Sequence, residues 1–157
     1  MRRFLLPLLL TTSLILAACS ASSSDQTPPE PAPVSTEVSS PSNPSITIID
    51  SQGSVTVEAT PLNLDAPADT LEFDVVLDTH SVDLSMDLAV LATLTTDTGI
   101  TVQATLWDAP RGGHHVTGKL IFPALKDGKS ILEGAGKLTL TITDVDVPSR
   151  IFEWELQ

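Results

Sequence analysis

The chain has 157 residues, of which 20 are acidic and 8 are basic, giving a formal charge of −12. Such an excess of negative charge disfavours binding to nucleic acids and to anionic lipid head groups. The sequence contains 1 cysteine, so no disulfide can form within the chain and the fold must be stabilised by a hydrophobic core.

The first twenty residues have the layout of a secretory signal. Arg2 and Arg3 form a short basic region, an apolar stretch follows over residues 4–16, and small residues lead to Cys19. No later apolar run reaches the ~18 residues that a membrane-spanning helix requires. We predict a signal peptide over residues 1–18 that is cleaved before Cys19. Loss of both arginines would leave 6 basic residues against 20 acidic ones, a formal charge of −14.

The segment Leu16-Ala17-Ala18-Cys19 resembles the lipobox of bacterial lipoproteins. The resemblance implies that a diacylglycerol with acyl chains such as palmitate is attached to the Cys19 sulfur, which anchors the chain outside the cytoplasm. Two or more acyl chains attach a protein lastingly to a bilayer, whereas one binds only marginally. Ser20 stands where an inner-membrane retention signal would have aspartate, which favours the outer membrane in a bacterium with two membranes.

Residues 19–44 are dominated by serine and proline and contain few large apolar side chains. Such a segment cannot bury enough surface to offset the entropy of ordering, so we expect a disordered tether after the lipidated cysteine. Fully extended at roughly 3.1 Å per residue, the tether would reach about 80 Å from the membrane.

From residue 45 the sequence alternates between apolar and polar residues, which indicates strands with one buried face. About eight short strands over residues 45–157 predict one all-β domain, an antiparallel immunoglobulin-like β-sandwich. Residues 83–91 are the best helical candidate, but they fit alternation better and are predicted to lie in a strand. The apolar positions of the runs are Ile46, Ile48, Val55, Val57, Ala59, Leu71, Phe73, Val75, Leu77, Val82, Leu84, Met86, Leu88, Val90, Val102, Ala104, Leu106, Val116, Leu120, Phe122, Leu138, Leu140, Ile142, Phe152, Trp154 and Leu156.

Residues typical of turns separate these runs. Segments 51–53 and 97–99 end in glycine and are predicted hairpin loops, and segment 123–136 is predicted to be an exposed loop. Four prolines are expected to interrupt strand pairing. They are Pro61, Pro67, Pro110 and Pro148.

The three histidines fall at two predicted strand ends. Asp78 and His80 share one face of the first strand, His115 lies on the polar face of the second, and His114 follows a glycine pair. If these strands are neighbours, Asp78, His80 and His115 converge, and imidazole with carboxylate is a good ligand set for zinc or copper. The alternative is that the histidines hydrogen-bond to loop backbone at strand ends, since their spacing matches no family-specific metal motif.

Aspartates in or near the predicted turns raise a calcium interpretation. However, Asp144-Val145-Asp146 is only a fragment of the Asp-x-Asp-x-Asp-Gly loop that calcium favours. Solvated acidic edges that protect sheets from edge-to-edge pairing explain these residues better. The aspartates concerned are Asp83, Asp87, Asp97, Asp108, Asp144 and Asp146.

Common enzyme motifs are absent from the sequence: it has no Gly-x-Ser-x-Gly, no His-Glu-x-x-His and no glycine-rich phosphate loop. An aromatic platform for carbohydrate is not indicated either, because Phe73, Phe152 and Trp154 fall on core positions. Trp107 is out of phase with its run, so it is either exposed or a packing lid at a strand end.

The segments 78–84, 112–115 and 152–154 resemble small secreted bacterial β-sandwich proteins of uncharacterised function. The resemblance implies the fold and an envelope location, and it carries no activity. We therefore expect a lipid-anchored binding or accessory module without catalytic activity, acting on an envelope protein or ligand whose identity the sequence does not reveal.

The alternative function is that of an envelope metal-binding protein, a zinc or copper carrier. Its candidate ligands are His80, His114, His115 and Asp78.

Overall fold

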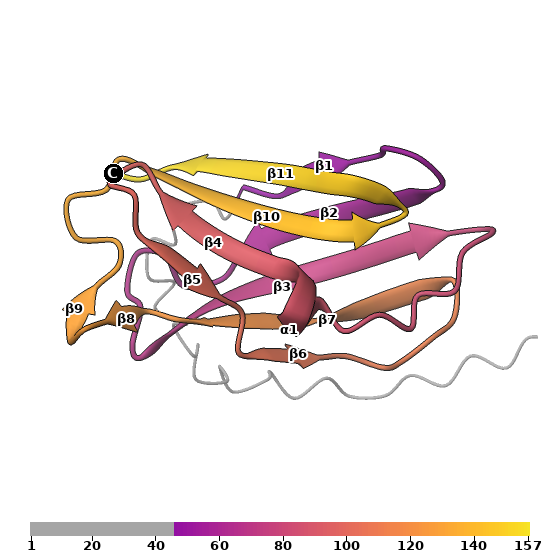
Figure 1. Cartoon of the computed structure of the whole chain (residues 1–157), viewed down its shortest axis with the longest axis horizontal. Coiled ribbons are helices and arrows are strands. Elements are labelled where there is room, and N and C mark those ends of the chain that lie inside the picture. Colours follow the sequence, from indigo (N-terminus) through magenta and orange to yellow (C-terminus); the bar gives the residue numbers. More distant parts are fainter. Residues whose placement is uncertain (1–45) are drawn as a thin grey trace, which may run out of the picture. The chain divides into compact units, whose positions relative to one another are not determined.

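The computed structural model describes residues 46–157, which form two antiparallel β-sheets stacked on each other (Figure 1). The predicted signal peptide at 1–18, the lipidated Cys19 and the tether at 19–44 lie outside the described residues.

The first sheet has five strands in the order β1-β2-β3-β7-β6. The second has four strands in the order β11-β10-β4-β5, and a separate short hairpin joins β8 and β9. The strands are β1 (Ile48–Asp50), β2 (Val55–Pro61), β3 (Thr70–Thr79), β4 (Ala92–Thr96), β5 (Thr101–Gln103), β6 (Leu106–Asp108), β7 (His115–Pro123), β8 (Leu125–Lys126), β9 (Lys129–Ser130), β10 (Lys137–Val145) and β11 (Val147–Glu155).

The strand order confirms the predicted immunoglobulin-like sandwich. The order β2-β3-β7-β6 corresponds to strands A-B-E-D of an immunoglobulin domain, and β11-β10-β4-β5 corresponds to G-F-C-C′. Eight strands thus form the expected framework. Strand β1 is an addition that lengthens the first sheet beside β2 and contacts β11 of the second sheet.

One core lies between the sheets, because the period-two pattern turns alternate side chains inward. Strand β3 alternates between buried and partly exposed residues along its whole length. The ring centroid of Phe73 on β3 lies 5.7 Å from that of Phe122 on β7, in edge geometry, and 5.3 Å from that of Trp154 on β11. The second contact crosses from one sheet to the other, so both sheets share this aromatic group.

The prediction that residues 83–91 lie in a strand is wrong. Residues 81–87 carry no regular structure, and Leu88–Leu91 form the short helix α1, with the Asp87 carboxylate accepting a hydrogen bond from the Ala89 main-chain N–H at 3.0 Å. Leu84 and Leu88 are buried, whereas Val90 is exposed. The segment crosses from the first sheet to the second and pairs as a strand with neither, although its inward positions up to Leu88 keep the predicted phase.

The predicted inward run through Val102, Ala104 and Leu106 is correct for its first two residues only. Leu106 is 49% exposed, while Trp107 packs against the core as a lid. The chain leaves the second sheet after β5 and joins the first at β6. A strand that changes sheets meets the core from the opposite side, so the inward phase shifts by one residue.

The predicted turns are largely confirmed. Gly53 and Gly99 both have positive φ, at +66° and +87°, in the loops that join β1 to β2 and β4 to β5. Pro61 ends β2, and Pro148 leaves a gap in the otherwise regular β10–β11 pairing. The predicted exposed loop at 123–136 contains the β8–β9 hairpin. The short helix in the described part of the chain lacks the length to cross a membrane.

Candidate functional site

The described domain has two ends with different chemistry. We call one the histidine end: it contains the turns at 51–54, 80–87, 109–114 and 144–146, tied together by bonds such as Thr79 N to His114 O at 2.9 Å. The other end lies where Figure 1 marks the C-terminus. It contains the segments 61–69, 97–100, 131–136 and 154–157.

Asp78 and His115 contact each other, as the sequence predicted for neighbouring strands. They are register partners across β3 and β7, and the His115 Nδ1 lies within hydrogen-bond distance of the Asp78 carboxylate. The other ring nitrogen, Nε2, lies 3.4 Å from the Thr117 hydroxyl. The pair is solvated, with the side chains of His115 and Asp78 exposed by 67% and 47%.

The other two histidines do not complete a ligand set with this pair. His80 lines a shallow hollow of about 240 Å³ together with Asp78 and Ser54. His114 contributes its main-chain carbonyl, which accepts a hydrogen bond from Thr79. Within residues 46–157, no group of three or more His, Cys, Asp or Glu side chains is placed to hold a metal ion. The structure therefore brings together Asp78 and His115 in direct contact, with His80 beside Asp78.

Several of the turn aspartates bind main-chain N–H groups. Asp97 accepts from Gly136 N at 3.1 Å, and Asp146 accepts from Ser54 N at 2.5 Å. Asp87 caps α1, as described above. These carboxylates hold loops in place, which is a more specific role than the solvated edge predicted from the sequence.

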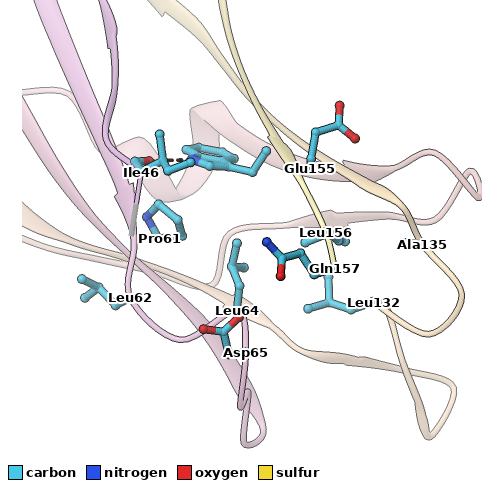
Figure 2. A pocket seen from close by; sticks show the side chains of 11 residues that line it. Ile46, Pro61, Leu62, Leu64, Asp65, Leu132, Ala135, Glu155, Leu156 and Gln157 are labelled. Atoms are coloured by element: carbon cyan, nitrogen blue, oxygen red, sulfur yellow. Dashed lines mark hydrogen bonds between the residues drawn. The ribbon is translucent and has the colours of Figure 1, made fainter. Parts of the chain in front are cut away.

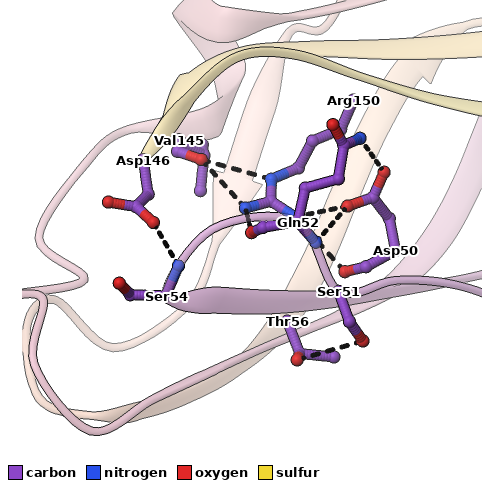
Figure 3. A network of polar contacts seen from close by, with 8 residues as sticks. All are labelled: Asp50, Ser51, Gln52, Ser54, Thr56, Val145, Asp146 and Arg150. Atoms are coloured by element: carbon purple, nitrogen blue, oxygen red, sulfur yellow. Dashed lines mark hydrogen bonds and ion pairs between the residues drawn. The ribbon is translucent and has the colours of Figure 1, made fainter.

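A buried arginine beneath the histidine end was not anticipated from the sequence. The Arg150 side chain is 0% exposed, and all five of its N–H donor positions have an acceptor (Figure 3). Nη1 lies 2.5 Å from Asp50 Oδ1 and 3.2 Å from the Asp50 carbonyl, Nη2 reaches the carbonyls of Gln52 and Val145, and Nε reaches Val145 as well. The guanidinium thus ties β1 to the β10–β11 turn.

The charge state of Asp50 follows from this network. Burial alone would raise the pKa of Asp50, but hydrogen bonds from the Gln52 side chain and main chain and the charge of Arg150 outweigh it. The pKa therefore lies below its ordinary value of 3.8, and the carboxylate stays ionised opposite Arg150.

The opposite end of the domain carries a cleft of about 300 Å³ that sequence reasoning also missed (Figure 2). We call it the Trp154 cleft. The Trp154 indole N–H donates to the Ile46 carbonyl at 2.8 Å, which fixes the orientation of this lining residue. Most of its lining comes from irregular segments before β1, after β2, before β10 and after β11, and alternation patterns do not describe such segments. The lining residues are Ile46, Pro61, Leu62, Leu64, Asp65, Leu132, Ala135, Trp154, Glu155, Leu156 and Gln157.

Comparisons with known proteins identify no family. No protein-family model matches the sequence, and no curated protein matches it. Among solved structures, the chain is similar to the crystal structure of a DUF4426 family protein from Pseudomonas aeruginosa PAO1. The match has a TM-score of 0.40 and 13% sequence identity, and it covers 69% of this chain and 94% of that one. The fold assignment above depends on the strand order of this chain alone.

Proposed function

We propose that this protein is a lipid-anchored, non-catalytic binding module of the bacterial cell envelope that faces outside the cytoplasm and takes a small ligand into the Trp154 cleft. The lipobox-like segment ending at Cys19 supports the anchor. The Ser20 that follows it supports the outer membrane where two membranes exist. The cleft is the observation that supports binding.

The Trp154 cleft has the size and the lining of a ligand site. Its volume is at the lower end of the ~300–1,000 Å³ that small-molecule sites span. Leucine side chains supply apolar surface, and polar groups contribute at least as much of the exposed lining, so a ligand could make both apolar contacts and hydrogen bonds. Leu62 stays 44% exposed, although burial would be favourable for it.

The anchor is tested by substituting Cys19→Ser and following incorporation of a labelled fatty acid in cells. Because the sulfur is the acylated atom, we expect the label to be lost and the protein to stay uncleaved or to be released from membranes. Ser20→Ala is the matched control and should label like the unmodified protein. Undiminished labelling of the Cys19→Ser variant would contradict the lipobox interpretation.

Ligand binding is tested on the mature chain, residues 19–157 with Cys19→Ser, in which Trp107→Phe leaves Trp154 as the single tryptophan. Its fluorescence then reports on the cleft during a titration with a library of small amphiphiles and sugars. We expect a saturable response to at least one class, and no response to any class would contradict the proposal.

A matched pair of leucines locates the response. Leu62 lines the cleft and Leu125 lies on the β8–β9 hairpin outside it, yet both are 44% exposed. Leu62→Glu should weaken binding about tenfold or more, because a charge then replaces apolar contact surface, whereas Leu125→Glu should leave binding unchanged. Equal effects of the two substitutions would place the ligand elsewhere.

A further inference from the structure

Strand β11 has one edge without a hydrogen-bonded neighbour. It stands at the end of the strand order of the second sheet, and its pairing partner is β10 (Figure 1). We propose that this outer edge of β11 is a second binding site, which takes up an extended polypeptide segment of another protein as an additional strand. The proposal goes beyond the proposed function and does not depend on a ligand in the Trp154 cleft.

The direction of the main-chain groups along β11 follows from its pairing with β10. Leu156 N donates to Gly136 O at 2.9 Å, so the main chain of Leu156 is directed toward the β10 side. Because this direction alternates along a strand, Phe152 and Trp154 point the same way, and the residues between them direct both N–H and C=O away from the sheet. Their main-chain groups make no hydrogen bond to another residue of 46–157. These outward residues of β11 are Ser149, Ile151, Glu153 and Glu155.

Strand β1 approaches β11 from the first sheet but does not pair with this edge. The contacts between them use inward side chains of β11: the Trp154 indole donates to the carbonyl of Ile46, just before β1, and Arg150 binds Asp50. The strand order joins β1 to β2 and not to β11. The outward main-chain groups of β11 therefore remain free to pair with an added strand.

The length of β11 distinguishes it from the other edges of the two sheets. Proteins commonly protect edge strands by keeping them very short or by covering them. Strands β1, β5 and β6 fit this rule with 3 residues each, and the Lys126 ammonium also covers part of β5 by binding the Thr101 carbonyl at 3.0 Å. Strand β11 has 9 residues. A long open edge is the surface that strand addition uses, with main-chain hydrogen bonds supplying affinity and side-chain contacts supplying specificity.

The side chains of β11 specify which segment can pair. Ile151 is 58% exposed on the outer face, so an apolar residue opposite it would gain contact. The Lys137 ammonium binds Glu153 and faces Glu155 as its register partner, so two carboxylates share one ammonium and an acidic segment is repelled. A second copy of this chain is disfavoured as well, since each copy carries a formal charge of −12. The partner is therefore a neutral or basic segment with alternating apolar residues.

Two synthetic peptides test the proposal: Lys-Val-Thr-Val-Thr-Val-Lys and its counterpart with glutamate at both ends. Each is labelled with a fluorophore and titrated with the mature chain carrying Cys19→Ser, and the anisotropy gives the Kd. We expect the basic peptide to bind about fivefold more tightly than the acidic one, a typical difference for partly exposed charges. Amide hydrogen exchange of the complex with the basic peptide should show new protection at the outward residues of β11 and unchanged protection at the residues between them.

Proline substitutions decide whether main-chain pairing carries the binding. Ile151→Pro removes an outward N–H but no bond to β10, so the domain should stay folded and the basic peptide should bind about tenfold more weakly. Ile151→Ala keeps the N–H and should weaken binding less. Thr101→Pro is the matched control, because the Thr101 N–H points outward from the β5 edge in the same way, and it should leave binding unchanged.

Absence of binding by the basic peptide, tighter binding of the acidic one, or equal effects of Ile151→Pro and Thr101→Pro would overturn the proposal. Protection of the outward amides that appears without peptide and rises with protein concentration would also overturn it, and would assign the edge to a second copy of this chain. Circular dichroism checks the fold of each variant. Should Ile151→Pro unfold the domain, Glu153→Pro replaces it, and the exchange pattern of the unsubstituted chain decides the question without a variant.

Discussion

Arg150 and Asp50 form an ion pair between strands of different sheets, with the Arg150 guanidinium wholly removed from solvent. Nη1 of Arg150 on β11 lies 2.5 Å from Oδ1 of Asp50 on β1, and the Asp50 side chain is only 12% exposed. Desolvating two charges is costly, and the five hydrogen bonds that the guanidinium donates to four acceptor atoms offset that cost. The pair therefore holds the added strand β1 against the edge of the second sheet.

We expect Arg150→Ala to destabilise the mature chain by about 3 kcal/mol or more, because it leaves Asp50 ionised without its partner and removes buried packing. Arg111→Ala is the matched control, since the Arg111–Asp87 pair at 3.3 Å is solvated, with exposures of 70% and 37%. The control should cost less than about 1 kcal/mol. Chemical denaturation of both variants measures the difference, and equal costs would refute a structural role for the buried pair.

The Asp50 carboxylate should make stability depend on pH in acid. Its folded-state pKa lies below the ordinary 3.8, so its contribution to the free energy of unfolding is fully present above that value. The contribution is lost as pH falls through the folded-state pKa. Asp50→Asn removes this titration while other carboxyl groups remain. The stability difference between the two proteins, measured by denaturation at several pH values, should therefore be constant near neutrality and shrink below about pH 4.

A difference that stayed constant down to pH 2 would show that the pKa of Asp50 is the same in the folded and unfolded states, and therefore that its network does not lower it. A difference that grew on acidification would mean that its pKa is raised and that burial prevails over the Gln52 and Arg150 contacts.

Gly53 is required by two independent constraints in the turn beside this pair. Its φ is +66°, and a Cβ at this position would overlap the Asp146 carboxylate that accepts from Ser54. Gly99 has a φ of +87° but open space around its Cβ position. Gly99→Ala should therefore cost only the backbone strain, about 1 kcal/mol, while Gly53→Ala should cost clearly more. Thermal unfolding compares them, and equal shifts would show that the Asp146 contact contributes nothing.

The sequence predicts the parts of this fold that periodicity governs. The alternation through Phe73 and Leu140 is read directly from strands that keep one face inward, and it locates both sheets. It fails at Val90, which lies in α1, and at Leu106, where the chain changes sheets and the inward direction changes. Such crossings depend on tertiary contacts such as the pairing of Leu84 with the 112–113 loop, which no local pattern contains.

The candidate sites also divide into those that alternation predicts and those that depend on tertiary contacts. Asp78 and His115 were expected to be close because strand phase and adjacency follow from alternation, and they are register partners. Arg150 and the Trp154 cleft were missed. In β11, Arg150 occupies one of the inward positions, which alternate with outward residues such as the glutamates. Its acceptors are mostly main-chain carbonyls of residues far away in the sequence. The one available signal was the phase of the strand, because Arg150 shares its face with the inward residues Phe152 and Trp154.

The histidine end should not bind zinc or copper measurably. Asp78 and His115 are already partnered with each other, and a protein zinc site takes three or four ligands, whereas direct contact joins only these two. Isothermal titration of the mature chain with either metal at neutral pH should give no saturable heat.

His115→Ala should cost less than about 1 kcal/mol of stability, because the pair is solvated. His114→Ala serves as the control, since His114 bonds through its main chain. Saturable heat that disappears in both His80→Ala and His115→Ala, yet persists in His114→Ala, would establish the metal site instead, since losing one ligand of a small set opens the coordination shell.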